Sequence, residues 1–188
     1  MSLKRAVLAV TALLLAAGLL VFFGVMDVAL ARWPVKTFRD HDRATVDLSP
    51  VETTVTDLAK LPRPDSRLFL GNRRIAPAER TVYRVRGLLQ NAHYESDGDL
   101  HMTVVDPQNP SVRMIVEIPK PLFSIGSDFA RTFGQLRREV DRHRPARGEP
   151  IEVTGIGFFD YRSHMRSGGA ENGIELHPVI GIVFPKGP

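Results

Sequence analysis

The sequence contains no cysteine among its 188 residues. Disulfide bonds, thiolate metal sites and cysteine nucleophiles are therefore excluded. The absence leaves the compartment open, because cysteine-free chains suit both the cytoplasm and a bacterial periplasm. Catalytic motifs are missing too, since the chain has no Gly-x-Ser-x-Gly elbow, no P-loop and no dinucleotide fingerprint. No catalytic residue is predicted, and the enzyme class is disfavoured without being excluded.

Charge excess and aromatic content are also low. The formal net charge is +4, and aromatic residues make up 7% of the chain. Such a small excess does not require a nucleic-acid partner. Arginine is clustered locally, from Arg63 to Arg86 and from Arg131 to Arg147. Runs of this kind are typical of solvated faces, or of surfaces attracted to anionic lipid or cell-wall polymers.

One long apolar run stands near the N-terminus. Ala6–Met26 contains 21 residues without a charge and follows Lys4 and Arg5. This length spans a bilayer and exceeds that of a usual signal-peptide core, which favours an uncleaved membrane anchor. The small-x-small pattern Ala29-Leu30-Ala31 keeps open a signal peptide cleaved near Ala31. Either alternative predicts that the rest of the chain lies outside the cytoplasm, facing the periplasm or the cell exterior.

Between this run and residue 80 the sequence shows little periodicity. We expect residues 1–31 to be the anchor or signal and residues 32–79 to be a linker. Ser49-Pro50-Val51-Glu52 has the form of a capping box, which predicts a short helix near residues 50–61. The folded domain is then expected over residues 80–184.

From residue 80 onward, apolar residues alternate with period two, interrupted by one helical stretch. The pattern predicts strands at 81–89, 99–106 and 111–118, a helix at 127–142, and strands at 150–159 and 174–184. This β-β-β-α-β-β order is that of an OB-fold, so we predict a mainly β, OB-fold-like five-stranded barrel with one core helix. An open α+β sheet is the alternative. Gly155-x-Gly157 inside a strand predicts a bulge.

The domain also carries a group of sequence motifs. The run GFFD…H…AENGIELHPV, with DGDLHM and MIVEIP upstream, resembles a group of small bacterial exported proteins of uncharacterised function. The resemblance covers roughly residues 80–184 and implies an exported domain of this fold. It implies no activity, cofactor or partner.

The first candidate binding element is the loop from Asp160 to Gly173. It is longer than a hairpin requires, is rich in glycine, and carries Arg162, His164 and Arg166 before Asn172. In an OB-fold this loop flanks the ligand face formed by the second and third strands. The predicted ligand-binding residues are Arg162, His164, Arg166, His101, Glu117 and Asn172. A flexible exposed connection is the alternative.

Side-chain parity predicts a second feature on that face. Even-numbered Met102 and Met114 should face inward with Phe133 and Ile180, which leaves His101 and Glu117 on the outer face. Barrel closure should bring Glu175 and His177 to the same surface. Imidazoles and carboxylates suit zinc or a similar divalent metal, with His101, Glu175 and His177 as candidate ligands. A structural His–Glu hydrogen bond or solvated side chains would explain the pattern equally well.

Taken together, these features predict an extracytoplasmic, membrane-tethered OB-fold binding module of the bacterial envelope. Its N-terminal helix would lie in the membrane, and its ligand would be an envelope protein or an anionic polymer. Single-stranded nucleic acid is not expected, because the second and third strands lack stacking aromatics. One alternative is a metal-dependent phosphodiester hydrolase, with Arg162 and Arg166 on the phosphate and Glu175 or Glu117 as base. The other is a structural brace in an envelope complex.

Overall fold

The computed structural model describes residues 32–160 and 169–185. The expected anchor or signal at 1–31 and the loop residues Arg162, His164 and Arg166 lie outside this range. Within the described ranges, no helix is both long and apolar enough to span a bilayer. Arg32–Pro188 forms one compact unit.

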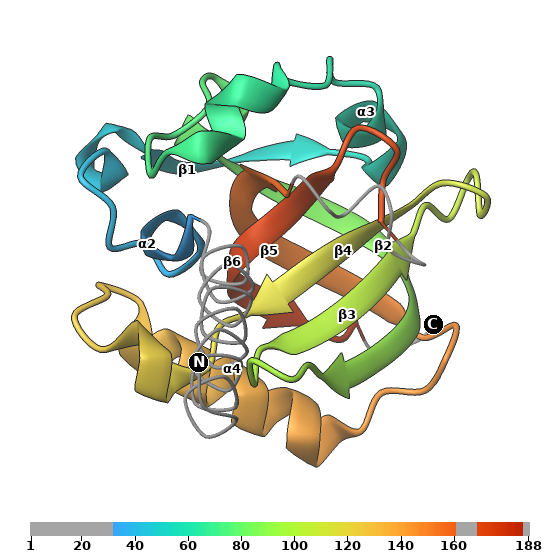
Figure 1. The fold of residues 1–188 in the computed structure, drawn as a ribbon. Coiled ribbons are helices and arrows are strands. Elements are labelled where there is room, and N and C mark those ends of the chain that lie inside the picture. Colours follow the sequence, from blue (N-terminus) through green and yellow to red (C-terminus); the bar gives the residue numbers. More distant parts are fainter. Residues whose placement is uncertain (1–31, 161–168, 186–188) are drawn as a thin grey trace, which may run out of the picture. The chain divides into compact units, whose positions relative to one another are not determined.

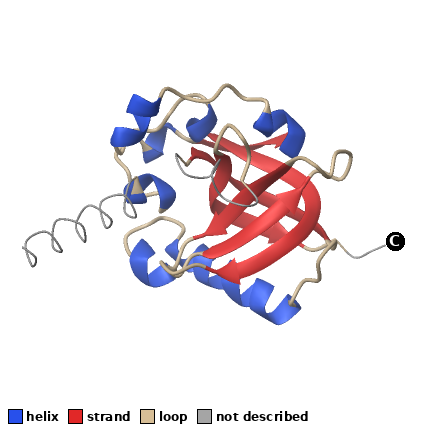
Figure 2. Cartoon of the chain, turned by 45° about the vertical axis from the view of Figure 1, so that its right-hand side comes forward, coloured by secondary structure: helices blue, strands red, loops and turns tan. Residues whose placement is uncertain are grey.

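The core of this unit is a closed five-stranded barrel (Figures 1 and 2). Its elements follow the chain as β2 (Thr81–Tyr94), β3 (Leu100–Val105), β4 (Arg113–Ile118), α4 (Ala130–His143), β5 (Pro150–Phe159) and β6 (Ile174–Val183). The strands pair in the order β2-β3-β4-β6-β5, and β5 closes the barrel by pairing with β2. Only the pairing of β4 with β6 is parallel among these barrel contacts. This confirms the OB-fold-like prediction over the open sheet.

The strand register explains which side chains fill the barrel. His101 pairs with Glu117, and Ile115 pairs with Glu175, so the even-numbered residues of β3 and β4 turn inward. Met102, Met114 and Phe133 are fully buried in one core, as expected, and Ile180 packs against that core partly buried. Phe133, Leu136 and Val140 form the buried stripe of α4.

The two glycines of β5 lie where other backbone segments approach the strand closely. The β5–β6 register shifts on both sides of Gly155, which confirms the predicted bulge. A Cβ atom at Gly157 would lie 2.3 Å from the carbonyl oxygen of Ala78, so no larger residue fits without moving the backbone. Gly157 therefore lets the segment before β2 approach the barrel wall, whereas Gly155 lets β6 pass close to β5.

The prediction that residues 32–79 are a linker is wrong, because this lead-in belongs to the compact unit. It contains α2 (Trp33–Lys36), η1 (Arg43–Thr45), β1 (Asp47–Thr53), α3 (Val55–Ala59), η2 (Ser66–Leu70) and η3 (Ala78–Arg80). β1 pairs in parallel with β2 and adds a sixth strand to the sheet.

The helix expected near 50–61 is shorter than predicted. The residues of the apparent capping box lie in β1, and the helix begins instead at Val55 after Thr54. The Thr54 side chain accepts a hydrogen bond from the Asp57 N–H, which caps the helix. Pairing with β2 gives residues 47–53 backbone partners that a helix would otherwise have provided.

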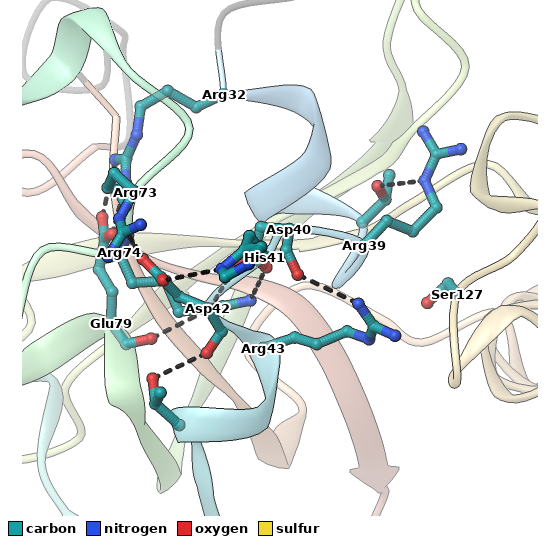
Figure 3. Close-up of polar contacts among 12 residues, drawn as sticks. Arg32, Arg39, Asp40, His41, Asp42, Arg43, Arg73, Arg74, Glu79 and Ser127 are labelled. Atoms are coloured by element: carbon teal, nitrogen blue, oxygen red, sulfur yellow. Dashed lines mark hydrogen bonds and ion pairs between the residues drawn. The ribbon is translucent and has the colours of Figure 1, made fainter.

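Two buried ion pairs connect distant parts of the lead-in, and one of them also contacts the barrel (Figure 3). Arg74 binds Asp40 with two hydrogen bonds of 3.0 and 2.7 Å, and neither side chain has any solvent exposure. Arg32 binds Glu79, and it also donates to the carbonyl oxygen of Phe159 at 3.0 Å. Glu79 in turn accepts the Phe159 N–H at 2.8 Å. The lead-in is thus joined to the end of β5, next to the predicted binding loop.

Candidate functional site

Six ionisable side chains gather on the outer face of β3, β4 and β6. We call them the polar cluster: Lys36, Asp99, His101, Glu117, Glu175 and His177. All six are buried, with the most exposed, Lys36, at 7%. Asp99 immediately precedes β3, Glu117 lies on β4, and Glu175 and His177 lie on β6. Alternation along the strands places these side chains away from the apolar core.

Glu117 is the centre of the polar cluster. Its Oε1 lies 2.8 Å from Nδ1 of His101, and its Oε2 lies 2.9 Å from Nδ1 of His177. The second nitrogen of His177, Nε2, is 3.5 Å from Oδ2 of Asp99. One carboxylate therefore bridges two imidazoles, and one imidazole lies between two carboxylates.

Lys36 brings a positive charge from α2 into the same region. Its Nζ lies 3.3 Å from Oδ2 of Asp160 and 4.0 Å from Oε2 of Glu117, and it also lies over the Phe158 ring. Burial alone would lower the pKa of Lys36, but the surrounding carboxylates outweigh it and raise the pKa. Asp160 is the last described residue before the loop, so this loop starts at the polar cluster.

Burial and neighbouring charges shift the other groups in different directions. Burial and the charges of Glu117 and Asp160 raise the pKa of Glu175 to about 8. Burial would lower the pKa of His177, but Asp99 and Glu117 raise it to about 9. Burial opposes ionisation of Glu117, yet its two imidazole neighbours hold its pKa well below the usual range. Protons on His177 and Glu175 therefore offset the carboxylate charge.

Several of these buried atoms lack a hydrogen bond. Both carboxylate oxygens of Glu175 and Oδ2 of Asp99 accept none among the described residues. The nitrogens of His177 lie at ion-pair distance from the carboxylates, but their angles miss hydrogen-bond geometry. A buried polar atom without a partner costs about 1–3 kcal/mol. Such atoms converging in one place are what a bound cation would satisfy.

Two ligand sets can be drawn from this region. Asp99, Glu117 and His177 each offer a ligand atom, and these atoms lie within 4.8 Å of one another. His93, Glu95 and His101 form a second set, with His93 exposed at the end of β2. The first set is entirely buried. Glu175 lies beside this set, with its Oε2 4.0 Å from Nδ1 of His177.

The predicted convergence of His101, Glu117, Glu175 and His177 is present in the structure. Asn172 has a different environment, since its side-chain amide donates to the carbonyl oxygens of Leu58 and Leu61 at 2.9 and 3.0 Å. Its own oxygen accepts the Ile174 N–H. Asn172 thus ties the end of α3 to the start of β6, which commits its polar atoms to the backbone.

Sequence reasoning missed three members of this region: Asp99, Lys36 and Asp160. Asp99 was detectable, because it shares the parity of His101 and so belongs on the same face. Asp97-Gly98-Asp99 forms a turn just before β3, with Gly98 at φ 86°. No pattern in the sequence indicated that Lys36 would reach the barrel.

The usual ligand face of an OB-fold is covered in this chain. Thr103 and Ile115, which point outward on β3 and β4, are buried together with the polar cluster. The lead-in contacts this side of the barrel at two places, since Lys36 lies 4.0 Å from Glu117 and the Thr56 N–H donates to Asp106. The burial of the face argues against a polymer ligand there, whereas an ion is small enough for a buried site.

The fold and the polar cluster define an OB-fold-like barrel domain with a buried ionic centre. No family model and no curated protein matches the chain. Among solved structures, a Leishmania major Friedlin protein assigned as an aspartyl-tRNA synthetase is similar with a TM-score of 0.38 and 12% sequence identity. The match covers 74% of this chain and 21% of that one, so the chain spans about a fifth of that protein. A likeness at this level has no bearing on function.

Proposed function

We propose that this protein is an extracytoplasmic, membrane-tethered OB-fold module of the bacterial envelope that binds a divalent metal ion in the polar cluster. One observation carries the proposal. Asp99, Glu117 and His177 present ligand atoms within 4.8 Å of one another, and all three side chains are buried. The unpartnered oxygens of Glu175 beside them supply a further ligand.

The charge balance of the site supports a cation. Among the residues that the structure describes, the carboxylates of Asp99, Glu117, Glu175 and Asp160 lie around the ammonium of Lys36 and outnumber it when the imidazoles are neutral. In the absence of metal, the raised pKa values of His177 and Glu175 supply protons that offset this charge. A divalent ion would do the same and would release those protons. One imidazole with carboxylates suits Zn²⁺ or Mn²⁺.

The proposal favours binding over hydrolysis. A hydrolytic metal needs an open coordination position that substrate can reach. The residues of the candidate set are at most 2% exposed, and Lys36 of the lead-in lies 4.0 Å from Glu117. The metal would therefore stabilise the barrel by joining β3, β4 and β6, while the rest of the surface meets an envelope protein or anionic polymer. Tethering is supported by the apolar run at Ala6–Met26, preceded by Lys4 and Arg5.

Metal content of the full chain tests this function. We expect detergent-purified protein, stripped by chelator and incubated with Zn²⁺ or Mn²⁺, to retain about one ion per chain after dialysis, as measured by elemental analysis. Binding should raise the thermal midpoint, since an ion at 100 times its dissociation constant adds about 2.7 kcal/mol. Asp99→Asn and His177→Ala should both abolish retention. The Asn variant keeps the side-chain oxygen that accepts the Lys120 N–H at 2.7 Å.

His143→Ala is the matched control, because His143 pairs with Glu149 on the exposed end of α4, away from the candidate set. This variant should retain the ion. If the unaltered protein retains no ion, and His177→Ala lowers stability alone, the polar cluster is a structural seam. The chain would then fit the brace hypothesis rather than the metal-binding one.

A further inference from the structure

The turn between β4 and α4 exposes three large apolar side chains. η4 spans Pro121–Ser124, and Leu122, Phe123 and Ile125 in and after it are 62%, 45% and 68% exposed. We call Pro121–Gly126 the apolar tip. Burying these side chains within the domain would have been favourable. Their joint exposure on one turn is typical of a surface that contacts a partner protein or a membrane.

The apolar tip lies next to the point where the described chain begins. Trp33 packs edge-on against Phe123 with ring centroids 6.2 Å apart, and its indole N–H donates to the Phe123 carbonyl oxygen at 3.2 Å. α2 and η4 are accordingly neighbours in Figure 1. The apolar run ends at Met26, and the few residues from there to Arg32 reach at most about 20 Å. If the apolar run lies in a membrane, so short a connection keeps the apolar tip near that membrane.

Cationic groups flank the apolar tip. The Lys120 ammonium lies 4.9 Å from the centre of the Phe123 ring. The exposed Arg39 donates to the Ile125 carbonyl oxygen at 3.1 Å, which places its guanidinium beside the most exposed residue of the tip. Apolar side chains flanked by Lys and Arg suit the boundary between lipid tails and anionic headgroups. A protein groove would not require these two cations.

We propose that the apolar tip inserts into the surface of a bilayer containing anionic lipid, an inference that rests on the proposed membrane tethering. Leu122 and Ile125 enter the acyl boundary, and Arg39 and Lys120 contact headgroup phosphates. The tip and the N-terminal run then attach the domain at two points. Attachment at two points fixes which face of the barrel is turned toward the membrane, which one short tether alone would leave free to rotate.

The absence of cysteine permits a direct test with single labels. Leu122→Cys and Ile125→Cys in the full chain, each labelled with an environment-sensitive fluorophore, are reconstituted into phosphatidylglycerol-containing vesicles. Leu68→Cys is the matched control, since Leu68 is similarly exposed, at 52%, on η2. We expect blue-shifted emission and quenching by spin-labelled lipid at positions 122 and 125, but not at 68. The effect should weaken in pure phosphatidylcholine vesicles and in an Arg39→Glu background.

The outcomes separate the tip from the tether. Water-exposed labels at 122 and 125, in protein that stays with the vesicles after an alkaline carbonate wash, overturn the tip proposal and leave tethering intact. Release by the wash shows that the tethering proposal is wrong. In that case, lipid quenching at positions 122 and 125 before the wash supports insertion of the tip, and its absence overturns the proposal. Labels that are shielded without lipid quenching show a protein contact at the tip, which also overturns the proposal.

Discussion

Replacing Arg74 by alanine is expected to lower the free energy of unfolding by about 3–5 kcal/mol, the cost of leaving a buried charge without its partner. The guanidinium holds both oxygens of Asp40 and also donates to the Glu79 carbonyl oxygen at 2.9 Å. Neither partner can recover these bonds from water, because the site has no solvent exposure. Urea denaturation of the full chain, followed by circular dichroism, measures the loss.

A matched control is available in the same lead-in. Arg67 binds Asp65 with the same two-bond geometry, but its side chain is 84% exposed. Arg67→Ala should leave the denaturation midpoint close to that of the unaltered protein, since exposed pairs contribute little. If both variants unfold at the same midpoint, the buried Arg74–Asp40 pair does not stabilise the folded chain, and the prediction is wrong.

The barrel was predictable because its strands are amphipathic. Alternation in β3 and β4 set the inward residues, and the helix between the third and fourth barrel strands set the topology. Once the topology was known, parity alone brought His101, Glu117, Glu175 and His177 to one face. Side chains alternate regularly along each strand, so the apolar pattern of the sequence predicts which face each residue occupies.

The lead-in could not be predicted in the same way. Its contacts come from single charges such as Lys36 and Asp40, which find partners far along the chain. In the sequence, these charges are indistinguishable from those of a solvated linker. β1 was missed for a related reason, because Ser49-Pro50 satisfies a helix-start pattern while backbone pairing with β2 decides the structure. For the ion pairs and for β1 alike, the partner lies far along the chain, so no local sequence pattern indicates it.

Raising the pH from about 5 to 9 is expected to destabilise the metal-free protein. Glu175, with a pKa raised to about 8, and His177, with a pKa raised to about 9, hold protons in the folded state that the unfolded chain would release earlier. Stability therefore falls between pH 4.5 and 8 for Glu175 and between pH 6.5 and 9 for His177. The lowered pKa of Glu117 contributes stability above its unfolded pKa, which is lost as pH falls through its folded value. Stability should be greatest near about pH 5.

Glu175→Gln isolates the carboxylate's share of this pH dependence. Glutamine cannot ionise, so the variant should lose the decline that begins near pH 4.5, keep the His177 decline that begins near pH 6.5, and be more stable than the unaltered protein at pH 8. Each unit of pKa shift corresponds to about 1.4 kcal/mol, so the difference should be at least on the order of 1 kcal/mol. Glu139→Gln, on the exposed face of α4, is the control and should leave the profile unchanged. Thermal unfolding in chelator across this pH range provides the measurement.

Adding Zn²⁺ to the same titration ties the pH profile to the proposed site. Binding requires a neutral His177 and an ionised Glu175, so metal affinity should rise with pH as the two protons are released. The stabilisation by Zn²⁺ should therefore grow from pH 5 to 9 and oppose the decline of the metal-free protein. A flat or rising profile in chelator would show that the buried carboxylates are already ionised. A steep decline that Zn²⁺ leaves unchanged would show that the polar cluster takes up protons but no metal.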